Sequence, residues 1–175
     1  ISVHGYNFPI PELSEPFFLK GADCWGWGTW KRGWALFERD GSKLLRELKR
    51  KKLLSRFDFF GGYLFSAMLK DQIKGKNQSW AVRWYASALL QGKLTLYPGK
   101  TLVRHIGADS GTHCKTGGME VFESDVGVHP VDLSDVRVEE DARAVDAIAA
   151  FLRGVGPPLH KRMMRKIARM VGWSG

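Results

Sequence analysis

The run from Ser79 to Leu90 constrains the fold of this chain more than any other segment. Its apolar side chains recur every three or four positions, which is the period of an α-helix, and the Gln91-Gly92 pair after it is a typical helix end. Because aromatic and aliphatic side chains dominate the run, we expect the helix to be buried. With 175 residues, 44% of them hydrophobic, the chain is long enough for one domain with a real core and too short for two.

Short extended segments accompany this helix. Residues 94–98 and 101–103 read as two strands joined by a Pro-Gly turn, and residues 126–131 also favour extended backbone. The segment 8–19 alternates apolar residues with prolines, which disfavours helix and suits extended backbone or an edge strand. We therefore predict an α/β chain, leaning towards α+β, with helices around a small mixed sheet.

The same helical spacing predicts the other helices. Aromatic residues predict one over 30–39, and leucines with basic residues opposite them predict the next over 42–51. An apolar-rich helix is expected over 57–73, interrupted by Gly61-Gly62. Residues 142–153 follow acidic residues that complement a helix dipole, and they form another predicted helix. The last predicted helix is the basic, amphipathic run 159–171.

The charge of the chain favours an anionic partner. Lys and Arg number 27 against 18 Asp and Glu, which gives a formal net charge of +9. Much of the excess lies in residues 43–56 and 160–169. Three kinds of anionic partner fit this charge equally well: nucleic acid, an anionic membrane and the diphosphate of a nucleotide-sugar. The tail 159–175 places cations opposite methionine and isoleucine, which is typical of a helix that lies on an anionic membrane surface.

Targeting signals and cysteines give further expectations. The sequence has no apolar run long enough to span a membrane and no signal peptide at its start, so we expect a cytoplasmic protein, peripheral on the inner membrane face. It opens without a methionine on an apparent strand end, from which we expect upstream residues. Cys24 and Cys114 lack CxxC spacing and are expected to be reduced thiols.

Glycines alternate with tryptophans over residues 21–30, which we call the indole–glycine block. Glycine lets the backbone approach another group closely, and each indole offers a broad apolar face with one N–H donor. Trp25 and Trp27 could serve either as core residues or as a platform for a sugar ring. The tryptophans at helical spacing are expected in the core: Trp30, Trp34, Trp80 and Trp84.

Four blocks together resemble the downstream half of bacterial family-two glycosyltransferases. They are GADCWGWGTWK at 21–31, SWAVRWYA at 79–86, LTLYPGK at 94–100 and the segment 106–114, which opens with Ile-Gly and ends with Gly-Thr-His-Cys. Their order and spacing match across roughly residues 8–114. The resemblance implies a partial GT-A fold, with an acceptor-side domain over 1–125, a strand and helix extension over 126–158 and the basic helix over 159–175.

The resemblance also implies a reaction. Such enzymes transfer a sugar from a nucleotide-sugar donor to a hydroxyl of a glycan or lipid-linked acceptor during polysaccharide or cell-envelope synthesis, and inversion at the anomeric carbon is expected. They hold a divalent metal, Mn²⁺ or Mg²⁺, largely through an Asp-x-Asp motif in their nucleotide-binding half. This sequence contains no Asp-x-Asp. We therefore expect an incomplete transferase that lacks the nucleotide-binding half.

Site residues follow from the matched blocks. In the family, a carboxylate at the start of the helix matching 79–90 is the general base, but Asn77 and Gln78 stand there and amides cannot accept the proton. The nearest carboxylate, Asp71, is the predicted base, and the alternatives are a catalytic carboxylate elsewhere in the chain or one that has been lost. Arg83 is expected either to form a buried salt bridge, for example with Asp71, or to reach the diphosphate.

The remaining predicted contacts surround the donor and the acceptor. Trp25 and Trp27 would stack on sugar rings, and three cations would neutralise the leaving diphosphate: Lys100, Arg104 and Lys115. His113 is expected to complete the coordination of the metal or to be a polar loop residue, and Asp109 to close a turn.

An alternative class of function is a non-catalytic, basic module that binds single-stranded nucleic acid or anionic surfaces. The tryptophans at core spacing, and the lack of a nucleic-acid-binding motif, count against it, so we expect no nucleic acid partner.

Overall fold

The computed structural model describes residues 1–104, 120–128 and 130–155. Its centre is a small mixed sheet with the strand order β2-β4-β1-β3. The strands are β1 (Ser2–His4), β2 (Phe17–Lys20), β3 (Trp27–Thr29) and β4 (Leu94–Tyr97). β1 is parallel to β4, whereas β3 is antiparallel to β1 and β2 is antiparallel to β4. A mixed α/β chain with a small sheet is therefore confirmed.

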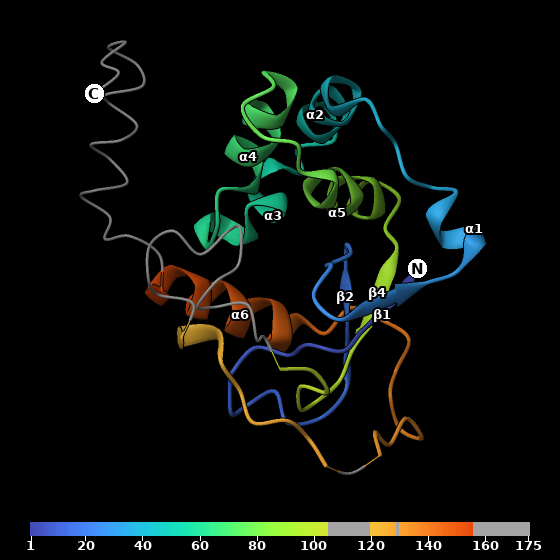
Figure 1. Ribbon diagram of the computed structural model, residues 1–175, viewed down its shortest axis with the longest axis vertical. Coiled ribbons are helices and arrows are strands. Elements are labelled where there is room, and N and C mark those ends of the chain that lie inside the picture. Colours follow the sequence, from blue (N-terminus) through green and yellow to red (C-terminus); the bar gives the residue numbers. More distant parts are fainter. Residues whose placement is uncertain (105–119, 129, 156–175) are drawn as a thin grey trace.

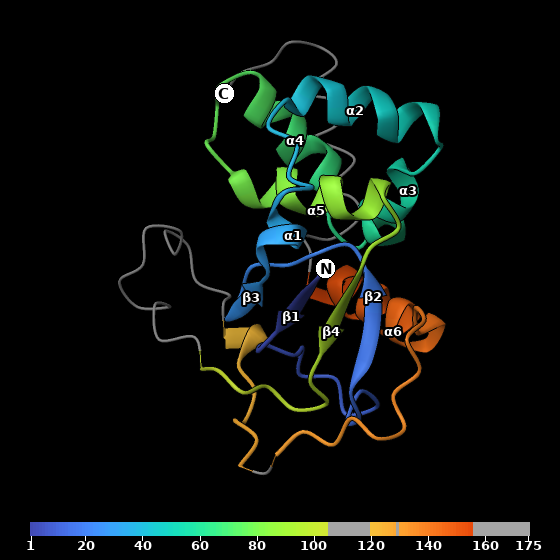
Figure 2. The same cartoon turned by 90° about the vertical axis from the view of Figure 1, so that its right-hand side faces the viewer.

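Helices fill the long connection between β3 and β4 and follow the sheet. They are α1 (Lys31–Trp34), α2 (Gly41–Arg50), α3 (Leu54–Phe57), α4 (Phe65–Ile73), α5 (Trp80–Leu90) and α6 (Ala142–Val155), with short 3-10 turns η1 (Phe59–Gly61) and η2 (Glu120–Phe122). Figure 2 shows α2, α4 and α5 together above the strands, with α6 behind β2 and β4. The helical layer therefore stands on one end of the sheet, and α6 covers one face.

Local sequence signals explain where the best-predicted helices begin and end. The Ser79 side chain accepts a hydrogen bond from the N–H of Val82 at the start of α5, and Asp40 does the same for Lys43 in α2. These caps satisfy N–H groups that a helix start leaves unpaired. Gly92, at a φ of +61°, follows the end of α5. The helix predicted over 79–90 is thus confirmed with its cap.

One hydrophobic core joins the sheet to both groups of helices. Phe17 and Leu19 of β2 pack with Leu48 of α2, Tyr85 of α5 and Ile148 of α6, all of them buried. Alternate residues of the strands face this core. Figure 1, which views the sheet nearly edge-on, shows α6 against this face, while no described helix covers the opposite one, where Val3 is exposed. The helix predicted over 142–153 is confirmed, and it shares the core of the preceding residues.

Four predicted elements differ from the structure. The strand expected within 126–158 is absent from the described residues of that range, which lead into α6 without a strand. Residues 101–103 form no strand, because their backbone bonds to the loop after β1 through Leu102 N–H and the carbonyl of Gly5. The helix expected over 30–39 is limited to α1. The helix expected over 57–73 is divided into α3, η1 and α4, since Phe59, Phe60 and Gly61 all have positive φ and no right-handed helix can continue through them. In the described part of the chain, no helix has the length and apolar character needed to cross a membrane.

Candidate functional site

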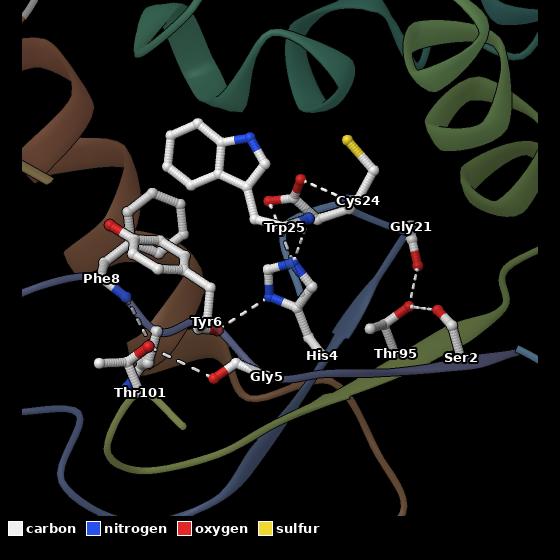
Figure 3. A network of polar contacts seen from close by, with 12 residues as sticks. Ser2, His4, Gly5, Tyr6, Phe8, Gly21, Cys24, Trp25, Thr95 and Thr101 are labelled. Atoms are coloured by element: carbon white, nitrogen blue, oxygen red, sulfur yellow. Dashed lines mark hydrogen bonds and ion pairs between the residues drawn. The ribbon is translucent and has the colours of Figure 1, made fainter. Parts of the chain in front are cut away.

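A buried polar network attaches the loop after β2 to the end of β1 (Figure 3). The side chain of His4, the last residue of β1, is fully buried. Its Nε2 accepts a 3.0 Å hydrogen bond from the backbone N–H of Trp25, and its Nδ1–H donates to the carbonyl of Tyr6 at 2.8 Å. These partners require a neutral imidazole. Burial lowers the pKa of His4 below its ordinary value, against the opposing effect of the Asp23 carboxylate.

The start of the same loop is attached to two strands. Thr95 of β4 donates its hydroxyl to the carbonyl of Gly21 at 2.7 Å, and it lies 2.6 Å from the hydroxyl of Ser2 in β1. Because Thr95 has one hydroxyl proton, Ser2 donates the second bond. Residues 22–24 therefore lie between two anchor points, Gly21 and Trp25. This arrangement fixes the backbone of Asp23 without using up its carboxylate.

Asp23 presents a partly exposed carboxylate on this fixed loop. One oxygen, Oδ1, accepts a 2.6 Å hydrogen bond from the N–H of Cys24, while Oδ2 lies 3.9 Å from Nε2 of His4. Nε2 carries no proton in the neutral tautomer described above, so that pair is a close approach and not a hydrogen bond. The side chain of Asp23 is 34% exposed. It can therefore accept a proton from a bound molecule.

Trp25 lies two residues further along, and its indole is half-buried against other rings. It makes edge contacts with Tyr6, at 4.9 Å between ring centroids, and with Phe122, at 5.7 Å. Figure 3 shows the indole projecting from the loop towards the helices above the sheet. An indole is a broad apolar surface of the kind on which the C–H face of a sugar packs. The carboxylate and the indole thus stand on the same short, anchored segment.

The neighbouring thiol, that of Cys24, is unreactive near neutral pH. Burial raises the pKa of Cys24 to about 12, and the Asp23 carboxylate adds to the effect. A thiol with such a pKa stays protonated near neutral pH, so it is a poor nucleophile and a poor metal ligand. Asp23 and Trp25 are therefore the groups of chemical interest in this segment.

A groove of about 1130 Å³ lies beside this segment, between residues 6–16, 99–104 and 122–132. Lys100 and Arg104, both predicted to contact a diphosphate, line it together. Its wall includes Tyr6 and Phe122, the two residues whose rings contact Trp25. The groove that holds these cations and the Trp25 indole therefore share two neighbouring rings, those of Tyr6 and Phe122. Acidic residues also line the groove, which makes its charge mixed: Glu15, Glu123, Asp125 and Asp132.

Asp71 lies elsewhere, near the end of α4. The next two residues, Gln72 and Ile73, pack against Gly41 at the start of α2. Since α4 packs against α2, α3 and α5, Asp71 belongs to the helical layer, whereas the indole–glycine block lies on the sheet. The structure does not place the predicted base within the segment that carries Trp25.

The guanidinium of Arg83 is used within the helical layer. Its Nη1 donates to the carbonyl of Arg39 at 3.1 Å, its Nε donates to the carbonyl of Ser79 at 3.4 Å, and the group stacks over the ring of Phe37. The contacts attach residues 37–39 to α5. The hydrogen-bond partners of Arg83 are backbone carbonyls, whereas the sequence suggested the Asp71 carboxylate as an example of a partner.

Four tryptophans form one cluster with a buried and an exposed side. Trp27 of β3 contacts the rings of Trp34, Trp80 and Trp84, and Trp84 is completely buried as predicted. The core assignment is wrong for Trp30, Trp34 and Trp80, which are 46%, 42% and 40% exposed. Trp34 and Trp80 face Trp27 of β3, but β3 is an edge strand, and no described element covers the outer side of the cluster.

A second carboxylate, Asp58, precedes α4. Its two oxygens accept hydrogen bonds from the N–H and the hydroxyl of Ser66, at 2.6 and 2.7 Å. Burial raises the pKa of Asp58, although the Ser66 bonds and the nearby Lys70 oppose this effect. Because both oxygens are occupied, Asp58 fixes the start of α4 and is less available to a ligand than Asp23.

Several predicted site residues lie outside the described residues: His113, Lys115, Asp109 and Cys114. The basic helix expected over 159–175 also lies outside them. Within the ranges that are described, no cluster of three or more His, Cys, Asp or Glu side chains could hold a metal ion. The predicted roles of His113 and Lys115 stay predictions.

Asp23 is the residue that reasoning from the sequence overlooked. It is the one carboxylate within residues 21–30, and it stands between Gly21 and Gly26, two residues before Trp25. Its position among close-packing glycines and stacking indoles was an available signal. The search for a base near the Ser79 cap led instead to Asp71.

No protein-family model, curated protein or solved structure matches this chain. The function must therefore rest on the geometry of the site and on the resemblance of the four sequence blocks.

Proposed function

We propose that this chain is the acceptor-binding part of a glycosyltransferase with a partial GT-A fold. It would act in the transfer of a sugar from a nucleotide-sugar to a hydroxyl of a glycan or lipid-linked acceptor. One observation carries the proposal: the anchored loop after β2 presents the Asp23 carboxylate and the Trp25 indole two residues apart. Sugar transfer needs both a surface for the ring and a base for the hydroxyl.

Asp23 is the proposed base, in place of Asp71. The acceptor hydroxyl gives its proton to the carboxylate as its oxygen attacks the anomeric carbon of the donor sugar. The bond between that carbon and the diphosphate oxygen breaks, and the diphosphate leaves with the electron pair. Attack opposite to the leaving group inverts the anomeric centre. The His4 bond to Trp25 N–H supports this chemistry by fixing the loop, so His4 is a positioning residue.

Charge on the leaving diphosphate must be neutralised for departure. Lys100 and Arg104 are proposed to do so from the groove beside Trp25. A divalent metal would supply Lewis-acid stabilisation when bound, but no cluster of ligands for it exists among the described side chains. We therefore assign no step here to a metal, and we propose that the nucleotide and the metal are held by a nucleotide-binding half.

Binding of the acceptor tests the first part of the proposal. We expect saturation-transfer NMR with a panel of bacterial oligosaccharides to show binding by the chain, and Trp25→Ala to remove it. Trp30→Ala changes an exposed indole outside the anchored loop and should leave binding unchanged. If no oligosaccharide binds, or if both variants weaken binding equally, the assignment of the site is wrong.

The role of the base is tested by turnover in a protein that joins this chain to a nucleotide-binding half. Asp23→Asn keeps the shape and the Cys24 N–H acceptor but cannot take a proton, so kcat should fall by roughly 10²–10⁴-fold with little change in acceptor affinity. Asp71→Asn is the matched control and should keep most of the activity. The reverse result would restore Asp71 as the base.

A second candidate function draws on the exposed indoles. Lys31 and Arg32 stand between Trp30 and Trp34 in the chain, Trp80 contacts Trp34, and the guanidinium of Arg32 lies over the ring of Trp30 at 5.2 Å. Half-exposed indoles beside cations suit a module that binds single-stranded nucleic acid by stacking and charge. An electrophoretic shift that weakens steeply with salt and is lost in Trp34→Ala would favour this function over sugar transfer.

A further inference from the structure

The loop that joins α3 to α4, residues 58–64, exposes a set of apolar side chains. We call it the Phe60 loop. Phe60, Tyr63 and Leu64 are 48%, 43% and 49% exposed, and all lie within five positions of one another. Phe59, between them and the core, is buried. Soluble surfaces rarely gather large apolar side chains in this way without a partner.

The backbone of the loop is held in a conformation that phenylalanine does not favour. Phe59 and Phe60 have φ values of +44° and +52°, and Gly61 continues at +86°. Hydrogen bonds from Gly61 N–H and Tyr63 N–H to the carbonyl of Asp58 close the loop, while the Asp58 side chain binds Ser66. The result directs consecutive phenylalanines to opposite sides, one into the core and one outward.

Two basic side chains of neighbouring helices, Arg153 and Lys70, interact with the loop. Arg153 of α6 donates a long hydrogen bond, 3.5 Å, to the carbonyl of Phe60, and its side chain is exposed. Lys70 of α4 is exposed and lies close enough to Asp58 to act on it electrostatically. Gly62 of the loop packs directly against Leu152 and Ala149 of α6. Figure 1 shows the segment between α3 and α4 on the same side of the molecule as the last turns of α6.

We propose that the Phe60 loop is a membrane-docking surface for an anionic lipid bilayer. Phe60, Tyr63 and Leu64 would enter the boundary between headgroups and acyl chains, and Arg153 and Lys70 would lie at the level of the lipid phosphates. An apolar tip with cations at its base is the arrangement that such an interface accepts. The Asp58 carboxylate does not oppose it, because it is turned inward onto Ser66. The formal charge of +9 favours the same partner.

Co-sedimentation of the full chain with two kinds of vesicle tests this surface. We expect binding to vesicles of phosphatidylcholine and phosphatidylglycerol in equal parts, and much weaker binding to phosphatidylcholine alone. Phe60→Asn removes the ring, and asparagine tolerates positive φ, so the variant should fold. Its partition, and separately that of Leu64→Ser, should fall by about tenfold. Val138→Asn, at a strongly exposed valine elsewhere, should bind like the unchanged chain.

A tail deletion and a measurement of molecular mass distinguish the Phe60 loop from the basic tail and from self-association. If deletion of residues 159–175 abolishes binding while Phe60→Asn leaves it unchanged, the Phe60 loop is not the docking surface. If light scattering shows a dimer that Phe60→Asn dissociates, and vesicles do not bind, the loop covers a second copy of the chain. Circular dichroism verifies that each variant is folded. The readout needs no sugar transfer, so it can fail or succeed independently of the proposed enzyme.

Discussion

Gly21 occupies a position where any side chain would collide with the core. Its φ is +112°, and a Cβ there would lie 2.4 Å from the Tyr85 ring. Gly75 also has a positive φ, +70°, but nothing lies within 4 Å of its Cβ position. We therefore expect Gly75→Ala to cost about 1 kcal/mol of unfolding free energy and Gly21→Ala at least about 2 kcal/mol more. Urea denaturation measures both, and equal losses would show that the loop moves away from Tyr85.

His4 should make the fold sensitive to mild acid. Burial depresses its pKa in the folded state, so below about pH 6.5 the unfolded chain takes up a proton that the folded chain refuses. Stability present above that pH is then lost progressively as the pH falls towards the depressed pKa. In His4→Gln, the amide oxygen can accept the Trp25 N–H without titrating, so the slope of unfolding free energy between pH 7 and 5 should flatten. An unchanged slope would show that groups other than His4 cause the pH dependence of the unfolding free energy.

At the scale of single elements, the start of α5 offers the clearest test of how a helix cap stabilises the chain. Ser79 caps its first turn with a 3.2 Å bond to the N–H of Val82. Ser79→Ala should destabilise the chain by about 1 kcal/mol, measured by urea unfolding. Ser134→Ala removes a hydroxyl that bonds to Asp132 in an exposed turn, and it should have little effect. Similar losses in both variants would contradict the capping role.

Local patterns predicted the elements whose signals are local. The cap, the apolar period and the terminal glycine of α5 all lie in one stretch of sequence, and so do the acidic start and apolar face of α6. β3 was missed because its strand state comes from pairing with β1, far away in the sequence. The break at residues 58–64 was only partly indicated by Gly61-Gly62, since two phenylalanines with positive φ are set by tertiary packing.

The arrangement of the whole molecule explains why the site was only partly predictable. The prediction of Asp71 as the base depended on its closeness in sequence to Asn77. Asp71 lies in the helical layer, however, and closeness to Asn77 in the sequence says nothing about its distance from Trp25 in space. Asp23 reaches its place because His4, Ser2 and Thr95 from two strands hold its loop. Lys100 and Arg104 were predicted from the resemblance, and the structure places both in one groove. The candidate site is formed by contacts between strands that are distant in the sequence. A local sequence pattern does not reveal such contacts.

Glu140 connects three parts of the molecule. Its carboxylate binds Arg56 of α3 at 2.6 Å and the Lys20 N–H of β2 at 2.9 Å, just before α6 begins. Burial would raise its pKa, but the bonds from Arg56 and Lys20 outweigh burial and hold the pKa below its ordinary value. The stability that this gives is present above about pH 4.3 and is lost as the pH falls further, below the range in which His4 acts.

Removing only one member of the ion pair between Glu140 and Arg56 should lower the free energy of unfolding more than removing both. The Arg56 side chain is only 12% exposed, and its Nη1 already has no hydrogen-bond partner in the part of the chain described. Glu140→Leu would leave a buried cation uncompensated, at about 3 kcal/mol of unfolding free energy. Arg56→Met with Glu140→Leu should recover part of that loss. Glu38→Gln, in an exposed pair with Lys43, should change stability far less. If the double variant shows the sum of the single losses, Glu140 and Arg56 act independently, and α6 is held to β2 and α3 by its apolar contacts alone.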